Sequence, residues 1–201
     1  SPSKKQNFVT KLTGKEKAVK FATLAHEGQL RKLSKQPYII HPLKVSKILE
    51  EAGFNEELVI AGLLHDTVED TDTTIEQIEK EFGPKVASYV VAHTEDKTKT
   101  WEERKQHTLD VVKNGSLEVK ALIVADKWDN LQSMTAGHDM MGDKIWTCFK
   151  RGLALQEWYI KGIAINCFHG LNDEDIPEFF HRYVKDVNDF FDSLPRSRSK
   201  N

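Results

Sequence analysis

Cysteine is scarce in this chain, and its scarcity excludes several kinds of protein. Only Cys148 and Cys167 occur among 201 residues, both in an apolar context. No Cys-x-x-Cys pair is present, which argues against a structural zinc site of the cysteine type. A disulfide is one reading of the pair, but two buried thiols fit the apolar surroundings better. The cysteines therefore indicate a reducing compartment.

Long hydrophobic runs are also missing. The longest apolar stretches, such as residues 58–64, are far shorter than the roughly 20 residues that a membrane helix needs. The first residues lack the basic, apolar and small-residue regions of a secretory signal. We therefore expect no membrane association and a cytoplasmic location.

Neither sign of charge is in excess. The chain has 29 Lys and Arg against 31 Asp and Glu, a net charge of -2. Nucleic-acid binders usually carry a basic excess, so we expect no nucleic-acid partner. A small anionic substrate stays compatible, because a local cluster of cations can be hidden in a neutral total. The composition does not indicate an oligomeric state.

Alternating β-type patterns are scarce, whereas helix signals recur throughout. Capping-box patterns begin at Thr13, Thr73 and Thr100, and Asn55 is a further N-cap. Apolar residues at helical spacing follow these signals and extend over 117–134, 143–169 and 176–194. We predict an all-α protein with one domain over 11–194, between a flexible N-terminus (1–10) and a flexible tail (195–201).

A histidine followed directly by an aspartate, His65-Asp66, is the first feature that points to chemistry. His65 falls on the apolar face of a predicted helix, where burying an imidazole beside a carboxylate is costly unless something pairs them. A divalent cation pairs both. Two adjacent ligands leave most of the coordination sphere empty. The candidates for the rest are His41, which precedes Pro42 where a helix begins, and Asp126, a carboxylate in an otherwise apolar helix.

This mixed nitrogen and oxygen set suits manganese or iron better than magnesium or zinc. Glu69 and Asp70 follow His65 and Asp66 by about one helical turn, so a continuing helix would carry all four on one face. We expect Glu69 to accept a proton from the attacking water and Asp70 to orient it. The alternative is that the pair caps the loop around Thr71.

Four segments around these residues resemble a known family. They are Ala25-His26-Glu27-Gly28-Gln29-Leu30-Arg31-Lys32, Pro37-Tyr38-Ile39-Ile40-His41-Pro42, His65-Asp66-Thr67-Val68-Glu69-Asp70-Thr71 and Ala125-Asp126-Lys127-Trp128-Asp129-Asn130. Their order is similar to the His…His-Asp…Asp ligand order of the HD superfamily. More narrowly, they look like the alarmone hydrolase domain of the RelA/SpoT homologues. The resemblance covers about residues 10–135 and does not include the synthetase half of the long members, so the chain is similar to the small alarmone hydrolases.

The resemblance implies a compact multi-helix HD-domain bundle around one metal site. It implies removal of the 3′-pyrophosphate from the nucleotides ppGpp and pppGpp, with Mn²⁺ as cofactor. The residues that it assigns are the metal ligands His41, His65, Asp66 and Asp126, the water-activating pair Glu69 and Asp70, and the nucleotide contacts Arg31, Lys32, Lys127 and Asn130. The 31–41 loop is one residue longer than the family pattern, and the region after 135 is not matched.

Two other functions stay open. One is an HD phosphohydrolase that acts on another 3′-phosphorylated nucleotide or a (d)NTP, and the other is a non-catalytic regulatory or antitoxin module. Lys97, Lys99 and Arg104 are candidates for binding phosphate outside the metal shell. Among the remaining histidines, His26 is a candidate for supporting the site. We expect the others to be surface or structural residues: His93, His107, His138, His169 and His181.

Overall fold

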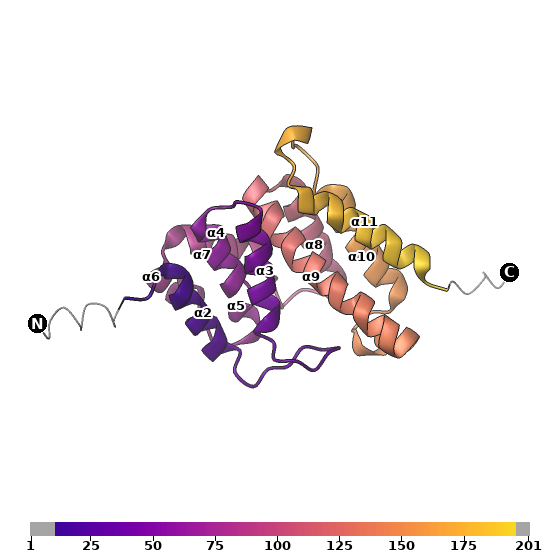
Figure 1. The fold of residues 1–201 in the computed structure, drawn as a ribbon, viewed down its shortest axis with the longest axis horizontal. Helices are drawn as coiled ribbons and strands as arrows, with labels where there is room; N and C mark the ends of the chain where they lie inside the picture. The colour runs from indigo at the N-terminus through magenta and orange to yellow at the C-terminus, as the bar shows by residue number, and fades with distance from the viewer. Residues whose placement is uncertain (1–10, 196–201) are drawn as a thin grey trace, which may run out of the picture.

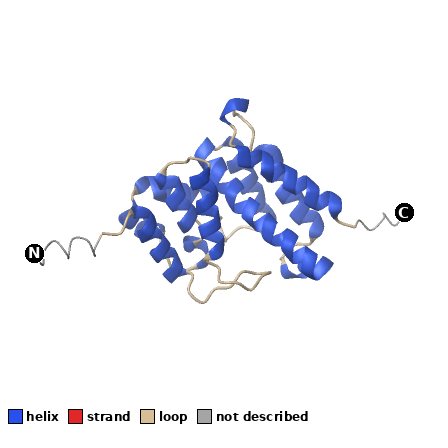
Figure 2. Ribbon diagram, in the orientation of Figure 1, coloured by secondary structure: helices blue, strands red, loops and turns tan. Residues whose placement is uncertain are grey.

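Helices make up the regular structure of residues 11–195, which are the residues that the computed structural model describes (Figure 2). They are α2 (Gly14–Ala25), α3 (Ile40–Glu51), α4 (Glu56–Leu64), α5 (Thr67–Asp70), α6 (Ile75–Phe82), α7 (Pro84–His93), α8 (Trp101–Asn114), α9 (Leu117–Met141), the 3-10 helix η1 (Gly142–Cys148), α10 (Leu153–Asn166), the 3-10 helix η2 (Asp173–Asp175) and α11 (Glu178–Ser193). Within this part of the chain there is no strand, only an isolated antiparallel bridge between Leu30 and Pro37. The all-α prediction is confirmed. Of the segments expected to be flexible, 1–10 and all of 195–201 except Pro195 lie outside the described residues.

Side-chain caps mark where α2, α4, α6, α8 and α9 begin. Asn55 accepts a hydrogen bond from the Leu58 backbone N–H, and Thr100 forms a full capping box with Glu103. The box predicted at Thr73 is wrong by one residue. Thr74 is the N-cap, and its partner is Gln77. Glutamine and glutamate serve the third position equally, so the pattern alone did not decide between two adjacent threonines.

The helix predicted over 143–169 is interrupted. Gly142, at a φ of 61°, ends α9 in a left-handed conformation, and η1 follows. An extended Gly152 then caps the start of α10. Glycine adopts both conformations without a steric penalty, so the apolar periodicity of this segment is divided between two elements. The irregular stretch between them carries Lys150 and Arg151, which line a cavity that α5, α8 and α9 also line.

Two long-range packing relations organise the molecule. Helix α4 is buried all round, from Leu58 to Leu64, and contacts α2, α3, α7 and α9. Helix α9 contacts α3, α4 and α7 on one side and α8, α10 and α11 on the other (Figure 1). The centre of α9 therefore lies where both groups of helices meet.

Two further features bear on earlier expectations. Cys148 and Cys167 are both free thiols, but only Cys167 is buried as predicted, and Cys148 is half-buried. Burial raises the pKa of Cys167 to about 12. Among the described helices, none combines the length and apolar character needed to cross a bilayer.

The continuing helix on which His65 and Glu69 would share one face does not form. Helix α4 ends at Leu64, and α5 begins at Thr67. Side chains form hydrogen bonds to carbonyl groups in the last turn of α4. His65 Nδ1 lies 2.7 Å from Gly62 O, and Thr67 Oγ1 donates to Leu64 O at 2.8 Å. Such side-chain bonds compete with the backbone ladder and interrupt the helix.

Candidate metal centre and cavity

The four predicted ligand residues come together from three parts of the fold. His41 is the second residue of α3, His65 and Asp66 link α4 to α5, and Asp126 lies in the middle of α9. All four are buried, and one ligand atom from each lies within 4.8 Å of the others. Buried side chains of this kind need a counter-charge or a metal ion.

Both histidines turn Nε2 toward this cluster. His65 Nδ1 lies 2.7 Å from Gly62 O, and His41 Nδ1 lies 2.7 Å from Asp129 Oδ2. Carbonyl and carboxylate oxygens only accept hydrogen bonds, so Nδ1 carries the proton in each neutral ring and Nε2 keeps its lone pair. The buried Nε2 of His65 has no hydrogen-bond partner among the described residues. These are the tautomers that metal ligation requires.

The distances between the ligand atoms also fit a cation. His41 Nε2 lies 2.7 Å from Asp126 Oδ1 and 3.6 Å from Asp66 Oδ2, and His65 Nε2 lies 2.9 Å from Asp66 Oδ2. Neighbouring ligands of a six-coordinate ion with bonds of about 2.1 Å are roughly 3 Å apart. Lone pairs facing carboxylate oxygens at these distances repel unless a proton or cation lies between them. The donor set therefore suits a divalent metal.

The electrostatics of the cluster point the same way. Burial on its own would lower the pKa of His41 and of His65, but the neighbouring carboxylates raise both. Burial would likewise raise the pKa of Asp126, yet Lys127 and the two histidines hold it well below its usual range. The site thus favours positive charge at its centre and ionised carboxylates around it.

Tyr38 and His26 support the centre from the side of α2. The Tyr38 hydroxyl donates to Asp66 Oδ2 at 2.5 Å, and burial followed by Asp66 raises its pKa, so it stays a donor. The His26 ring is buried, and its centroid lies 4.9 Å from that of Tyr38. His26 therefore reaches the ligands through Tyr38.

His93 is a site residue that the sequence analysis missed. The expectation of a surface or structural role is corrected: His93 Nε2 lies 3.0 Å from Asp126 Oδ2, and its ring centroid lies 4.8 Å from that of His65. Val86, Val90 and His93 share one helical face, and both valines are buried. That shared face was the signal available in the sequence.

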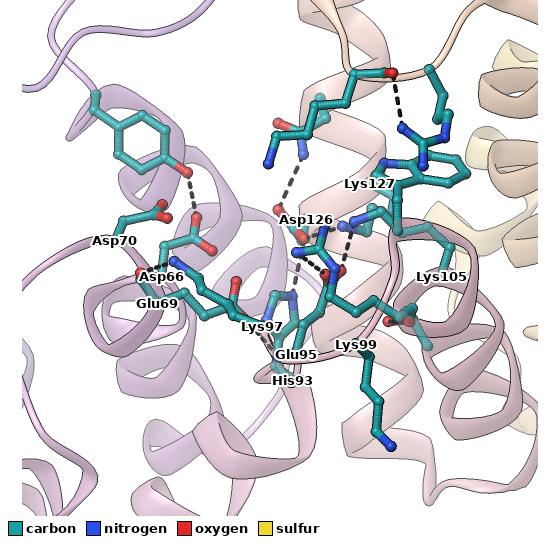
Figure 3. Close-up of a pocket in the computed structure, with 17 residues that line it drawn as sticks. Asp66, Glu69, Asp70, His93, Glu95, Lys97, Lys99, Lys105, Asp126 and Lys127 are labelled. Carbon is teal, nitrogen blue, oxygen red and sulfur yellow. Dashed lines mark hydrogen bonds and ion pairs between the residues drawn. The ribbon is translucent and has the colours of Figure 1, made fainter.

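A cavity of about 680 Å³ opens beside the centre. Figure 3 shows Asp66, Glu69 and Asp70 on one side of it and Lys99, Lys105 and Lys127 on the other, with Asp126 and His93 between them. The expectation that Glu69 and Asp70 face the same space as Asp66 thus agrees with their positions, despite the break between α4 and α5. The cavity joins an acidic side to a basic side.

The acidic pair is held and partly desolvated. Glu69 Oε1 accepts a hydrogen bond from the Glu95 backbone N–H, and Lys97 Nζ donates to the Glu69 carbonyl oxygen. Burial raises the pKa of Glu69 against the effect of the Glu95 hydrogen bond. Burial, assisted by the charge of Asp66, raises the pKa of Asp70. Both carboxylates are therefore stronger proton acceptors than exposed ones.

The cations of the cavity come from the segment between α7 and α8, from α8 and α9, and from the stretch before α10. The cations lining the cavity are the predicted Lys97, Lys99, Arg104 and Lys127, and also Lys105, Lys150 and Arg151, which sequence reasoning missed. Glu95 pairs with Lys105 at 2.7 Å and with Arg104 at 3.4 Å, and Lys127 pairs with Asp126 at 3.0 Å. Cations thus outnumber the carboxylates that hold them on the basic side.

The four predicted nucleotide contacts divide into two groups. Lys127 and Asn130 line the cavity, and Asn130 Nδ2 donates to Asp126 Oδ1 at 3.4 Å. Arg31 instead pairs with Asp129 and lines a separate cavity of about 400 Å³, whereas Lys32 Nζ lies 4.9 Å from the centroid of the Phe149 ring. Contact of Arg31 and Lys32 with a nucleotide stays a prediction.

Comparison with known proteins agrees with this geometry. Residues 18–145 match the HD domain family. The chain is 44% identical over 120 residues, 58% of its length and 67% of the relative's, to the guanosine-3′,5′-bis(diphosphate) 3′-pyrophosphohydrolase MESH1 of Xenopus tropicalis. A crystal structure from Listeria monocytogenes EGD-e superposes with a TM-score of 0.73 at 53% identity, covering 76% of this chain and 99% of that one. The structure of a metazoan ortholog of SpoT that hydrolyses ppGpp superposes with a TM-score of 0.73 at 26% identity, covering 93% of this chain and 99% of that one.

Proposed function

This chain belongs to the HD domain family, and on that premise we propose that it removes the 3′-pyrophosphate of ppGpp or pppGpp, yielding GDP or GTP and pyrophosphate. The reaction in the name of the MESH1 relative and the ppGpp hydrolysis by the SpoT ortholog support this substrate. Family membership alone admits other phosphohydrolases. The substrate is therefore argued from the site.

The observation that carries the proposal is the division of the cavity into an acidic metal side and a basic side. A guanosine 3′,5′-bis(diphosphate) has a pyrophosphate at each of two ribose positions. One faces the ligands and Glu69, and the other is neutralised by cations such as Lys99 and Lys150, which line the same cavity. A substrate with one phosphate group would leave half of this charge unused.

The metal ligands are His41, His65, Asp66 and Asp126, and Mn²⁺ is the ion that we propose. Two imidazole nitrogens and two carboxylate oxygens form a borderline donor set, which suits Mn²⁺. A divalent ion held there would lower the pKa of a water molecule and polarise a phosphoryl oxygen. In both histidines Nδ1 donates a hydrogen bond to an oxygen, which keeps Nε2 available for the ion.

Glu69 accepts the proton of the attacking water, and Asp70 orients that water. The water oxygen attacks the phosphorus that is bonded to the 3′ oxygen. The bond between this phosphorus and the 3′ oxygen then breaks. The proton that Glu69 gains balances the one that the departing 3′ oxygen takes up. The raised pKa of Glu69 and its fixed position against Glu95 suit this role.

Of the four residues predicted to contact the nucleotide, two line the cavity. Lys127 and Asn130 line the cavity beside Asp126 and are proposed to face the substrate directly. Arg31 and Lys32 do not line this cavity, and only the family resemblance supports a contact between them and the nucleotide.

The domain organisation and the cellular location of the reaction are proposed from the cavity lining and the cysteines. Residues 11–194 act as one hydrolase domain, since α5, α7, α8 and α9 all contribute to one cavity. The free thiols of Cys148 and Cys167 fit a cytoplasmic location, where alarmones act in the stringent response.

The test is to incubate the purified protein with ppGpp and Mn²⁺, with and without EDTA, and to separate the products by ion-exchange chromatography. We expect GDP and pyrophosphate, and EDTA should prevent their formation. Asp66→Ala should abolish both Mn²⁺ binding and turnover. Glu69→Gln should bind Mn²⁺ normally and lose about 10²–10⁴ in kcat.

Glu79→Gln is the matched control, because it removes the same charge from an exposed position on α6. It should behave as the wild type. If the wild type binds Mn²⁺ and leaves ppGpp intact, the alarmone is rejected as substrate. A panel of other 3′-phosphorylated nucleotides and (d)NTPs would then identify the reaction.

A further inference from the structure

Asp129 is a buried carboxylate beside the metal centre that the ligand set does not include. It lies on α9 and is 2% exposed. Its Oδ2 atom accepts a hydrogen bond from His41 Nδ1 at 2.7 Å and pairs with Arg31 Nη2 at 3.0 Å. One oxygen thus links a predicted ligand to an arginine that is itself buried.

We propose that Asp129, held by Arg31, is a positioning residue that sets the tautomer and ring orientation of His41. This inference rests on the proposed metal site and deepens it. The carboxylate acts through the histidine and does not touch the ion or the substrate.

The two histidines show why His41 needs such a residue. His65 is oriented from within its own helix, because its Nδ1 bonds the carbonyl of Gly62. His41 lies in the first turn of α3, and its Nδ1 partner is 88 residues away in sequence. Only the packing of α3 against α9 supplies that partner.

Helix α9 engages both nitrogens of the His41 ring. Asp126 Oδ1 lies 2.7 Å from Nε2, and Asp129 Oδ2 lies 2.7 Å from Nδ1. The two aspartates are three residues apart, so they occupy one face of the helix. The hydrogen bond from Nδ1 to Asp129 fixes the ring so that Nε2 faces the space where an ion would lie between it and Asp126, and a carboxylate at Nδ1 makes Nε2 a more basic ligand.

Arg31 completes the arrangement by compensating the buried carboxylate. A buried anion with a single neutral donor is costly, and a guanidinium supplies a charged hydrogen bond. The guanidinium group that the family resemblance assigns to the nucleotide is therefore directed at Asp129 here. Its loss should weaken metal binding even when no nucleotide is present.

The experiment measures Mn²⁺ affinity in the substrate-free protein, by electron paramagnetic resonance of free Mn²⁺ during titration. Asp129→Ala should raise the Kd for Mn²⁺ by about 10–100-fold. Asp129→Asn keeps an accepting oxygen and the side-chain volume, so it should raise the Kd by less. Arg31→Met should raise it several-fold, and Arg31→Lys should restore part of the loss.

Asp139→Ala is the matched control, since it removes an exposed aspartate from the same helix. Its Kd should equal that of the wild type. Circular dichroism and thermal unfolding verify the fold of each variant. If Asp129→Ala does not fold, the Mn²⁺ affinities of Asp129→Asn and Arg31→Met test the proposal instead.

Two results overturn the inference. One is a Kd within twofold of wild type in the folded Asp129 variants. The other is an Arg31→Met protein whose KM for ppGpp rises while its Kd for Mn²⁺ is unchanged, because this result assigns Arg31 to the substrate. The titration uses no nucleotide, so weakened Mn²⁺ binding supports the inference even if ppGpp proves not to be the substrate.

Discussion

Gly62 controls how closely α3 and α4 pack, and hence how close His41 lies to His65. A Cβ atom at this position would meet Ser46 Cα at 3.2 Å, Ser46 N at 3.3 Å and Leu49 Cδ1 at 3.1 Å. Two of these three atoms belong to the α3 backbone, which yields only if the whole helix moves. The ring centroids of His41 and His65 are 5.2 Å apart across the same interface.

We predict that Gly62→Ala destabilises the protein, although alanine is the better helix former. The helix-propensity gain is about 1 kcal/mol. Forcing a methyl group against the backbone costs about 1–3 kcal/mol. The net loss of about 1 kcal/mol should lower Tm by roughly 2–4 °C in a chain of this length. The same displacement should weaken Mn²⁺ binding, because it separates ligands carried by the two helices.

Gly14→Ala is the matched control. Its Cβ would meet Glu56 Oε1 at 3.1 Å and Ile60 Cδ1 at 3.2 Å, which are equally close but are the ends of flexible side chains. Calorimetry and Mn²⁺ titration on both variants make the comparison, and the control should change stability by less than about 0.5 kcal/mol. If Gly62→Ala raises Tm and leaves the Kd unchanged, the interface is softer than this reasoning requires.

Three further predictions follow from the site and the core. Mn²⁺ at 100 times its Kd should stabilise the protein by about 2.7 kcal/mol, seen as a Tm rise of roughly 5–10 °C that EDTA reverses and that Asp66→Ala does not show. Burial raises the pKa of Glu69 above 4.5, its ordinary value, and the ionised form is the one that accepts a proton. The value of kcat/KM should therefore increase as pH rises through a midpoint above 4.5. A midpoint below 4.5 contradicts the role of Glu69 as the base. Lys120 Nζ donates to Val112 O and Lys113 O, both at 2.6 Å, so Lys120→Met should leave two carbonyl groups without this donor. It should cost about 2 kcal/mol in urea unfolding, with the KM for ppGpp unchanged; a shifted KM would show that Lys120 acts on the site.

The sequence predicted the parts of the site that have a local signature. Capping residues such as Asn55 and Thr100 indicated where helices begin, because their hydrogen bonds join neighbouring residues. A lone carboxylate at Asp126 and the His65-Asp66 pair stood out, because polar groups on apolar faces need partners. These features, together with His41 before Pro42 and the family resemblance, predicted an all-α protein and the four residues that come together.

Local patterns failed where side chains compete with the backbone. The spacing of His65 and Glu69 would suit one continuing helix, but His65 and Thr67 bond the carbonyls of Gly62 and Leu64, and the helix is interrupted there. Lys150 and Arg151 lie in a segment that periodicity assigned to a helix, so their place at the cavity was not foreseen.

Only the tertiary structure decided which distant residue meets which. Nothing near His41 in sequence indicates that Asp129 lies at its Nδ1, or that Arg31 is directed at the same carboxylate. Likewise, His93 reaches Asp126 through the packing of α7 against α9. A helical period determines which face a residue occupies, whereas its partner across that face is set by how the helices pack.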